Sequence, residues 1–451
     1  MKKNDIVTIE ITDTTAEGSG VGRIENMVVF VQGAFTGDKL GTKIIKRTKK
    51  YCIGKIEELL EPSESRKDSV CSAFPRCGGC MFPHIRYEAE LEMKRRWVEE
   101  NFKRIGGIDI GVKRVVASPN TGGYRNKGIY PVVRDENGQV RAGFYARHSH
   151  RIAGRAECAL HPAFFGDIVK TVTAFLQEND ISIYDEEKKR GLVRSIFIRH
   201  GEVSGDTMVC LVVNGDGIPC EGELVNRLTK IPQVTGVVIN TNTTDGNVLL
   251  GEKCRTVSGK GHITDMLRGL KFDIAPTAFY QVNRQGAELL YGIAEEYAAP
   301  EGGLLIDLYC GAGTIGLSMA KRADRVIGAE IVPSAVENAR ANAERNGVTN
   351  AEFILADAGQ AAVELEKRGE RPQVVILDPP RAGCSVEAIE AVVKMQPDRV
   401  VMVSCNSATA ARDAKLFAEL GYQPQEITAV DMFPRTGHIE CVLLLNREKN
   451  Q

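Results

Sequence analysis

The chain has 451 residues, of which 43% are hydrophobic and 26% are charged, as is typical of globular proteins. This length exceeds what one hydrophobic core serves and predicts about three domains. No stretch approaches the roughly 20 apolar residues of a membrane helix. The alternating apolar positions from Ile6 to Ile11 are a strand pattern and not a signal peptide, so a cytoplasmic location away from membranes is expected.

Charge is distributed unevenly along the chain, although the formal net charge is only −1. Residues 1–170 hold 29 Lys and Arg against 21 Asp and Glu, and the remainder holds 29 against 38. Between Lys43 and Lys55 there are six basic residues and no acid. A basic front half indicates binding of a polyanion. A solvated, charged strand is the alternative.

The first 60 residues alternate β-like runs with turns and predict a small five-stranded barrel of the OB type. Residues 61–65 form a linker, and 85–104 have the apolar spacing of a helix. Residues 110–275 indicate a β-rich central region with a turn at 122–127 and a helix at 164–177. Its expected strands are 193–199, 207–213 and 236–240.

From about residue 280 the pattern changes to alternating strands and helices, which predicts an α/β domain with a parallel, doubly wound sheet. The expected strands are 304–308, 325–330, 374–377, 399–404 and 441–445. The expected helices are 316–322 and 334–346, the second with Ser334 as its N-cap.

A glycine loop, G-A-G-T-I-G from Gly311 to Gly316, follows the first of these strands. Such a loop brings the backbone close to a nucleotide-like cofactor, and an acid ending the second strand, here Glu330, can accept both ribose hydroxyls. Asp307 before the loop favours S-adenosylmethionine over NAD, because a carboxylate repels a pyrophosphate and attracts an ammonium group. Cys310 inside the loop is interpreted as a packing residue.

Two further loops follow strands at the same edge of the sheet, where ligands of open α/β sheets bind. Asp378-Pro379-Pro380-Arg381 is stiffened by its prolines, and Ser404-Cys405-Asn406 opens a helix. A helix N-terminus lowers the pKa of a nearby thiol, which marks Cys405 as a nucleophile. Glu440 begins the last apolar strand, where a charge is costly without a purpose; an exposed acid at a strand edge is the alternative.

Three of the twelve cysteines form a C-x5-C-x2-C run, Cys71, Cys77 and Cys80. Zinc sites show two C-x2-C pairs, so this uneven run suits an iron–sulfur cluster with a distant fourth cysteine better. Cys158, near the basic residues Arg147, Arg151 and Arg155, is the best candidate for the fourth. Six other cysteines are interpreted as structural, and they are Cys52, Cys210, Cys220, Cys254, Cys384 and Cys441.

Together these features resemble the bacterial 23S ribosomal RNA (uracil-5-)-methyltransferase family with an N-terminal TRAM domain. The resemblance covers nearly the whole chain. It rests on the barrel and the cysteine run, on the three strand-end loops, and on Tyr124-Arg125-Asn126-Lys127, Cys158, Phe279-Tyr280-Gln281-Val282-Asn283 and His438-Ile439-Glu440. It is closer than the resemblance to transfer RNA uracil-5-methyltransferases, which are expected to lack the barrel and the cysteine run.

The resemblance implies a TRAM barrel at 1–62, an iron–sulfur loop and central RNA-recognition domain at 63–275, and a Rossmann-like class I methyltransferase domain at 276–451. It implies a [4Fe–4S] cluster on Cys71, Cys77, Cys80 and Cys158. The residues expected to hold S-adenosylmethionine are Gln281, Asp307, Tyr309, Gly311, Gly313, Thr314, Glu330, Asp357 and Asp378. The expected partner is 23S ribosomal RNA, with no DNA and no membrane, and the protein is expected to be a monomer.

The implied chemistry gives Cys405 and Glu440 separate tasks. Uracil C5 is too weak a nucleophile to attack a sulfonium methyl unaided. The Cys405 thiolate therefore adds to C6, and C5 then takes the methyl group. Glu440 removes the C5 proton, and elimination releases Cys405.

Four alternatives differ in substrate or class. They are a transfer RNA uracil-5-methyltransferase, an NAD-dependent oxidoreductase with an iron–sulfur relay, a non-catalytic RNA-binding protein with a relic Rossmann domain, and a DNA cytosine-5-methyltransferase. The oxidoreductase leaves the loops at 378–381 and 404–406 without a task. A relic does not need Cys405 and Glu440, and the DNA enzyme normally carries its nucleophile in a Pro-Cys loop.

Overall fold

The computed structural model describes residues 2–147, 149–154, 156–246 and 248–448. The chain forms two compact units. The first unit comprises Met1–Arg96, Phe144–Gly154 and Phe433–His438, and the second unit comprises Trp97–Gly143, Arg155–Met432 and Ile439–Gln451. Arg155, part of the basic run expected beside Cys158, lies outside the described residues.

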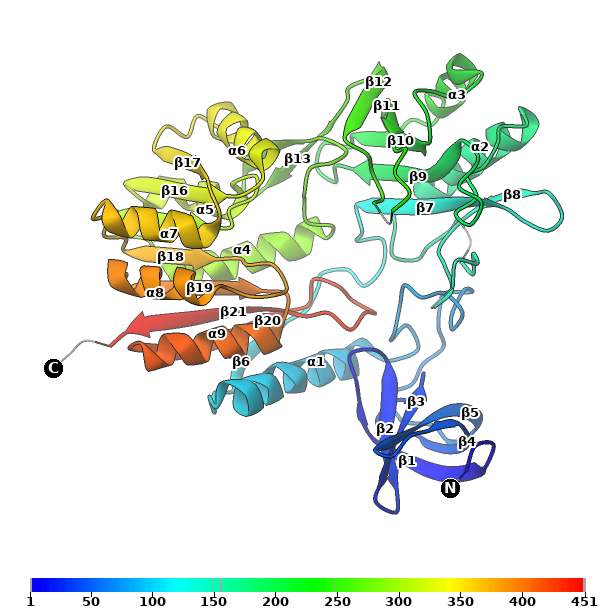
Figure 1. The fold of residues 1–451 in the computed structure, drawn as a ribbon, viewed down its shortest axis with the longest axis horizontal. Coiled ribbons are helices and arrows are strands. Elements are labelled where there is room, and N and C mark those ends of the chain that lie inside the picture. The colour runs from blue at the N-terminus through cyan, green and yellow to red at the C-terminus, as the bar shows by residue number, and fades with distance from the viewer. Residues whose placement is uncertain (1, 148, 155, 247, 449–451) are drawn as a thin grey trace. The chain divides into compact units, whose positions relative to one another are not determined.

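A closed five-stranded barrel begins the first unit and confirms the expected small barrel (Figure 1). Its strands are β1 (Ile6–Thr14), β2 (Ser19–Ile24), β3 (Met27–Gln32), β4 (Lys39–Arg47) and β5 (Tyr51–Glu61), closed in the order β1-β2-β3-β5-β4. Inward-facing Ile9, Val29, Leu40 and Ile44 fill the barrel, each at most 2% exposed. Closure removes the free strand edges that an open sheet of this size would present.

The helix expected at 85–104 is divided in two. Helix α1 (Tyr87–Asn101) continues as a short π-helix, Phe102–Gly106, which ends at Gly107 with φ of 67°. Helices often end at a residue in the left-handed conformation, and glycine is favoured there because it has no Cβ.

A six-stranded sheet and a hairpin make up the central part of the second unit. The sheet runs in the order β12-β11-β10-β9-β7-β8. Its strands are β7 (Lys127–Arg134), β8 (Val140–Ala142), β9 (Val193–His200), β10 (Thr207–Val213), β11 (Val234–Thr241) and β12 (Lys253–Gly259). Helices α2 (Phe164–Glu178) and α3 (Glu221–Leu228) accompany it, and β13 (Ile263–Leu267) pairs with β14 (Leu270–Ile274).

An eight-stranded sheet forms the rest of the second unit, in the order β17-β16-β15-β18-β19-β21-β20-β6. Its strands are β6 (Val112–Val116), β15 (Leu304–Leu308), β16 (Arg325–Glu330), β17 (Ala351–Leu355), β18 (Val374–Leu377), β19 (Arg399–Ser404), β20 (Tyr422–Val430) and β21 (Glu440–Arg447). Between them lie α4 (Arg284–Ala298), α5 (Thr314–Met319), α6 (Pro333–Arg345), α7 (Ala358–Lys367), α8 (Val386–Met395) and α9 (Ser407–Glu419). The expected α/β fold is confirmed.

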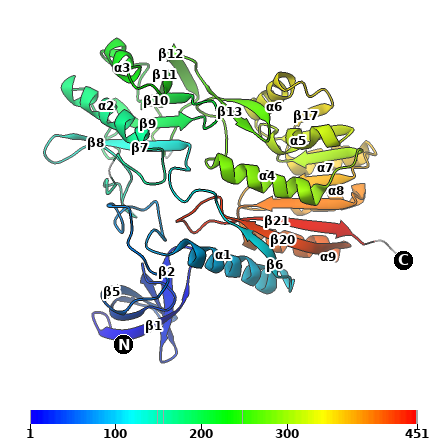
Figure 2. The same cartoon turned by 180° about the vertical axis from the view of Figure 1, so that it is seen from behind.

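Helices cover both faces of this sheet. Helices α7, α8 and α9 pack with it in one apolar cluster, which contains Ala361, Val392 and Phe417, and α4 lies on the other face (Figures 1 and 2). The apolar strands β15, β18 and β19 are therefore buried from both sides, as their continuous hydrophobic runs predicted.

The sheet differs from the fully parallel expectation at one side. Strand β21 is antiparallel to both β19 and β20, because residues 431–439 join β20 to β21 without the helix that a parallel crossover needs. The reversal places the first residue of β21 at the edge where β19 ends. Strand β6, from the segment assigned to the central region by sequence, completes the sheet beside β20.

One helix starts differently from its prediction. Helix α6 has Val332 as its N-cap and Pro333 at its first helical position, so Ser334 does not cap it. Proline is favoured there because its fixed φ already suits a helix. In the described part of the chain, no helix is both long and apolar enough to cross a membrane.

Candidate active site

The glycine loop joins β15 to α5 through three residues with positive φ. Tyr309, Gly311 and Gly313 have φ of 68°, 55° and 79°. A Cβ on Gly311 would meet no protein atom within 4 Å, so the backbone there faces open space. A Cβ on Gly313 would lie 3.1 Å from Phe353. The loop therefore needs both glycines, one for its conformation beside a ligand and one also for packing.

Two acids flank this loop at the ends of β15 and β16. Asp307 is 1% exposed; its Oδ2 accepts from the Gly316 amide at 2.8 Å, and its buried Oδ1 has no hydrogen-bond partner. Burial, with the negative charges of Asp378 and Glu330, raises the pKa of Asp307 to about 7. Glu330 accepts from the amides of Gly311 at 3.0 Å and Val332 at 2.9 Å.

These groups match the chemistry of S-adenosylmethionine. The orphaned Oδ1 of Asp307 is a buried acceptor that a cationic amino group would satisfy. Glu330 is fixed at the end of the second strand, where ribose hydroxyls are bound in this class of fold. The open backbone at Gly311 leaves room between the two acids.

Gln281 and Thr314 both lie beside Tyr291, a residue that the sequence analysis did not identify. The buried Tyr291 hydroxyl of α4 lies 3.4 Å from Thr314 Oγ1 and also hydrogen-bonds with Gln281. Burial raises the pKa of Tyr291, and the charge of Asp378 raises it further. In the sequence, Tyr291 is marked only by its position on the apolar face of a helix. A residue that merely packs in the core has the same pattern.

The Tyr124–Lys127 motif supports the same corner through the backbone. Asn126 donates its side-chain amide to the Gln281 carbonyl at 2.9 Å and its main-chain amide to the Val282 carbonyl at 2.8 Å. Asn283 then caps α4 by accepting from the Gly286 amide at 3.0 Å. Two motifs that are distant in sequence are therefore joined beside Gln281.

The loops after β18 and β19 are fastened to each other. Asn406 Nδ2 and Thr409 Oγ1 both donate to the Arg381 carbonyl, at 3.0 and 3.3 Å. Arg412 of α9 donates to the Ala382 carbonyl at 2.9 Å. The loop that carries Asp378 is thus held in a fixed position beside Cys405, as preorganised sites require.

Cys405 stands between the end of β19 and helix α9, which Asn406 caps. The expected lowering of its thiol pKa is wrong for this structure. Burial raises the pKa of Cys405, and the charges of Glu440 and Asp378 raise it further, against the opposing charge of Arg381. Burial is the largest of these effects, and the two neighbouring carboxyl groups add to it.

Glu440 is the first residue of β21 and is only 5% exposed, so it is not an exposed acid at a strand edge. Burial and the charge of Asp378 raise its pKa to about 8, with Arg381 opposing. Burial likewise raises the pKa of Asp378 to about 7. Three carboxyl groups that hold protons near neutral pH, those of Asp307, Asp378 and Glu440, therefore gather in this unit, as in sites that move protons.

Asp357 follows β17 and is exposed. It caps α7 by accepting from the Gly359 amide at 2.9 Å. The structure therefore gives this expected cofactor residue a structural role as the N-cap of α7.

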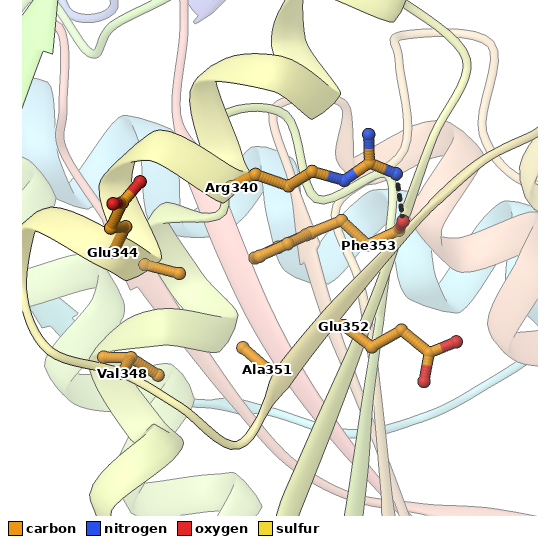
Figure 3. A pocket seen from close by; sticks show the side chains of 7 residues that line it. Arg340, Glu344, Val348, Ala351, Glu352 and Phe353 are labelled. Carbon is orange, nitrogen blue, oxygen red and sulfur yellow. Dashed lines mark hydrogen bonds between the residues drawn. The ribbon is translucent and has the colours of Figure 1, made fainter.

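A surface hollow of about 460 Å³ lies between α6 and β17 (Figure 3). Arg340 extends across it and donates to the Phe353 carbonyl at 2.8 Å. None of the expected site residues lines this hollow, whose other lining residues are Ala343, Glu344, Val348, Ala351 and Glu352. The hollow is thus separate from the acids, the thiol and the glycine loop.

The cysteine run lies on one loop of the first unit, and its three thiols are half-buried. The Gly79 amide donates to Cys77 Sγ at 3.5 Å, and Arg147 donates to the Cys80 carbonyl at 3.1 Å. Cys158 belongs to the second unit. The thiol donors suit iron–sulfur chemistry, yet across the described ranges no three His, Cys, Asp or Glu side chains are gathered as a metal site.

The sequence of this chain matches two protein-family models and is similar to known RNA methyltransferases. The family model described as tRNA (Uracil-5-)-methyltransferase matches residues 258–448, and the TRAM domain model matches residues 2–56. An RNA methyltransferase of Clostridium tetani is 38% identical over 447 residues, which are 99% of this chain and 97% of the relative. Another from Caldanaerobacter subterraneus is 41% identical over 441 residues, 97% of each chain.

A solved structure is similar over almost the whole chain. It is Pyrococcus abyssi tRNA (uracil-54, C5)-methyltransferase in complex with S-adenosyl-L-homocysteine, with a TM-score of 0.78, 28% identity and coverage of 97% of this chain and 100% of that one. The expectation that transfer RNA enzymes lack the N-terminal barrel is wrong for this enzyme, because so extensive a match includes the barrel residues. The chain therefore belongs to the RNA (uracil-5-)-methyltransferases that carry an N-terminal TRAM domain.

Proposed function

We propose that this protein transfers the methyl group of S-adenosylmethionine to C5 of a uridine in 23S ribosomal RNA through a covalent adduct on Cys405. One observation carries the proposal. Cys405 and Glu440 lie at the adjacent ends of the paired strands β19 and β21, and the charge of Asp378 raises the pKa of both side chains. A thiol and a carboxyl in this arrangement serve nucleophilic addition and proton removal at adjacent carbons.

S-adenosylmethionine supplies the electrophilic methyl group when it is bound. Cys405 Sγ forms a bond to uracil C6, and the electron pair of the C5–C6 double bond moves toward C5. After C5 has taken the methyl group, Glu440 accepts the C5 proton. The electron pair of that C–H bond restores the double bond and expels the Cys405 thiolate, so the enzyme returns to its first state.

The raised pKa values suit this sequence of steps. A carboxyl group with a pKa of about 8 is a stronger base, when ionised, than an exposed glutamate. Arg381 is the positive group that opposes the rise at both Cys405 and Glu440, which favours their charged forms. Hydrogen bonds from Asn406 and Thr409 to the Arg381 carbonyl hold this loop next to the segment that carries Cys405.

RNA recognition is assigned to the TRAM barrel and the basic segment between Lys43 and Lys55. Lys46, Arg47, Lys49, Lys50 and Lys55 are exposed at the end of β4, in the turn after it and on β5. OB-type barrels bind nucleic acid through such surfaces. The target uridine must leave its stack to reach Cys405, as in other enzymes that modify bases.

A uridine in transfer RNA is the second candidate substrate. The similar Pyrococcus abyssi structure is that of a tRNA (uracil-54, C5)-methyltransferase, and its match includes the barrel. Mapping 5-methyluridine in ribosomal and transfer RNA from a deletion strain separates the two. Loss of the mark from 23S RNA alone supports our proposal, and loss from transfer RNA alone contradicts it.

We also propose that Cys71, Cys77, Cys80 and Cys158 bind a [4Fe–4S] cluster. The support is their spacing and the thiol donors of the first unit. Nothing in the methyl transfer needs an electron, so the cluster would shape an RNA-contacting surface. Iron and sulfide in anaerobically purified protein, lost on Cys→Ser substitution, test this assignment, and zinc without iron contradicts it. A monomeric, cytoplasmic protein with no DNA or membrane partner completes the proposal.

The covalent step is tested by mixing the protein with S-adenosylmethionine and an RNA that carries 5-fluorouridine. Fluorine at C5 cannot leave as a cation, so Glu440 has no proton to remove and the adduct persists. Mass spectrometry is expected to find protein, RNA and one methyl group in a single species. A Cys405→Ala protein should form none, and an adduct in that variant would contradict the assignment of the nucleophile.

A further inference from the structure

Two positive side chains lie opposite each other on the paired strands β7 and β9 of the second unit (Figure 1). Lys127, the first residue of β7, is in register with Arg199 of β9. Residues directly opposite in an antiparallel pair project from the same face of the sheet, with Cβ atoms about 5 Å apart. Like charges in this position destabilise the pairing. The sheet therefore carries a repulsive pair that its own folding does not need.

Arg199 is the buried member of this pair and is only 2% exposed. Its guanidinium donates to the carbonyls of Ala275 at 2.7 Å and Ala278 at 2.9 Å. Burial lowers its pKa to about 10, so it stays positively charged at neutral pH. Its hydrogen bonds go to uncharged groups, and across the described part of the chain neither Arg199 nor Lys127 forms an ion pair with a carboxylate.

Lys127 is the accessible member of the pair. Burial alternates along β7: Gly128, Tyr130 and Val132 are buried, whereas Lys127 and Ile129 are half-buried on the opposite face. A ligand can therefore reach the Lys127 ammonium from solvent.

The surroundings of Lys127 disfavour its positive charge. Burial lowers the pKa of Lys127 to about 8, and the charges of Arg199 and Arg125 lower it further. Both neighbouring charges that shift it are cations. An anion beside the ammonium would reverse this effect and stabilise the charged form.

Asn126 holds this lysine next to the candidate active site. Its side-chain and main-chain amides donate to the carbonyls of Gln281 at 2.9 Å and Val282 at 2.8 Å, and its own carbonyl accepts from the His200 amide at 2.8 Å. Lys127 is the next residue, about 3.8 Å along the backbone. Its position is therefore fixed relative to the segment that carries Gln281.

RNA is the polyanion that the reaction brings to this part of the second unit. Each nucleotide contributes one negatively charged phosphate, and a lysine ammonium is a compact charge that binds phosphate well. The partial exposure of Lys127 suits a macromolecule that approaches from solvent. The carboxylate of S-adenosylmethionine is the other anion of the reaction, and the experiment below separates the two.

We propose that Lys127, supported by the positive charge of Arg199, binds a backbone phosphate of the RNA substrate beside the target uridine. This contact lies in the second unit and is additional to the RNA contacts assigned to the barrel. The bound phosphate offsets the repulsion between the two cations, which the free protein tolerates. The inference rests on the proposed function, because it takes RNA as the substrate.

The test compares Lys127→Met, which keeps an unbranched side chain and removes the charge, with Lys127→Arg, which keeps the charge. Lys253→Met is the matched control, because Lys253 is exposed and begins β12, at the other edge of the same sheet. The probe is an unmodified transcript of 23S RNA or transfer RNA, whichever the wild-type protein methylates. The Kd for this RNA is measured between about 50 mM and about 200 mM KCl. The Kd for S-adenosylmethionine and the melting temperature without RNA are measured in parallel.

A phosphate contact predicts a specific combination of results for Lys127→Met. The slope of log Kd for RNA against log salt concentration should fall by about 0.7 to 0.9, the contribution of one phosphate. RNA binding should weaken by about tenfold or more at the lower salt concentration. The melting temperature should equal or exceed that of wild type, because the repulsion with Arg199 is removed. The Kd for S-adenosylmethionine should stay within about twofold.

The two other variants complete the prediction. Lys127→Arg should keep the wild-type salt slope, since a guanidinium also binds phosphate. Lys253→Met should match wild type in every measurement. An equal fall of the slope in Lys253→Met and Lys127→Met would show that net charge, and not a contact at Lys127, explains the effect, and the proposal would be wrong.

Three further outcomes overturn the phosphate site. A wild-type slope in Lys127→Met shows that Lys127 contacts no phosphate. A lower melting temperature, with RNA binding lost in proportion to folded protein, shows that the lysine is structural. A weaker affinity for S-adenosylmethionine with an unchanged slope assigns the ammonium to the cofactor carboxylate.

The proposed function is judged separately from this site. If the wild-type protein methylates neither transcript, the proposed function fails. The salt slope on the 23S RNA transcript still decides the phosphate site in that case, because it requires binding and not methyl transfer.

Discussion

Cys405 and Glu440 face each other across two paired strands. Ser404 of β19 is in register with Cys441 of β21, so the next pair at that edge is Cys405 with Glu440. They are 35 positions apart in sequence, and the antiparallel direction of β21 alone brings them together. Burial raises the pKa of the Cys405 thiol, and the charge of Glu440 raises it further.

Replacing the nucleophile should remove chemistry without removing cofactor binding. In Cys405→Ala we expect no detectable transfer of radiolabelled methyl to RNA, because C5 is not activated without addition at C6. Calorimetry should give a Kd for S-adenosylmethionine within about threefold of wild type, since the thiol serves the base and not the cofactor. Sustained turnover by this variant would exclude the covalent mechanism.

Gly311 should be needed for the cofactor in a way that another left-handed glycine is not. Gly311→Ala puts a methyl group into the open space beside Glu330 and should weaken S-adenosylmethionine binding by about tenfold or more. Gly369→Ala is the matched control, because Gly369 has φ of 77° and a Cβ there also meets no atom within 4 Å. Equal loss of affinity in the two variants would show that backbone strain, and not the ligand, explains the effect.

The pH dependence should report a high-pKa base. Glu440 must be ionised to accept the C5 proton, and its pKa of about 8 means that most of the free enzyme is protonated at pH 6.5. Because proton removal follows the irreversible methyl transfer, the steady-state kcat should rise by about tenfold or more between pH 6.5 and pH 8.5. The raised pKa of Cys405 acts in the same direction. A profile already flat above pH 6 would contradict this assignment.

The same pKa shift predicts a stability effect with a definite sign. The folded pKa of Glu440, about 8, lies above the ordinary value of 4.5, so the folded protein holds this proton more tightly than the unfolded chain. The contribution of Glu440 to stability is most favourable below pH 4.5 and is lost as the pH rises to about 8.

Glu440→Gln removes this titration. The variant should therefore melt at a higher temperature than wild type at pH 8.5, by an amount that corresponds to a few kcal/mol at most. The difference in melting temperature should shrink as the pH approaches 5. A variant that is less stable than wild type at pH 8.5 would mean that the Glu440 carboxylate is well compensated in the folded protein.

Much of the fold was predictable because its signals are local. Alternation of apolar residues gave the barrel strands, and continuous apolar runs gave β15, β16, β18 and β19 within one or two residues. Glu330 and Asp378 could be predicted as site residues because they lie at the ends of predicted strands, and ligands bind at the carboxyl ends of parallel strands.

The features that the sequence missed depend on contacts between residues that are distant along the chain. Strand β6 joins the large sheet through β20, more than 300 residues later, and no local pattern marks that pairing. The thiol pKa of Cys405 is raised because folding buries the thiol and brings Glu440 and Asp378 to it. Tyr291 became a candidate site residue only when its hydroxyl was placed beside Gln281 and Thr314.

The most direct test of the central claim is a denaturing gel of Glu440→Gln after reaction with ordinary, unfluorinated RNA. The amide is nearly isosteric, so C6 addition and methyl transfer still proceed, but the C5 proton cannot be removed and elimination stalls. The account predicts a slow band of protein joined to RNA that requires S-adenosylmethionine and disappears in the Cys405→Ala, Glu440→Gln double variant. Wild-type turnover by Glu440→Gln, or a stalled enzyme with no RNA attached, would contradict it.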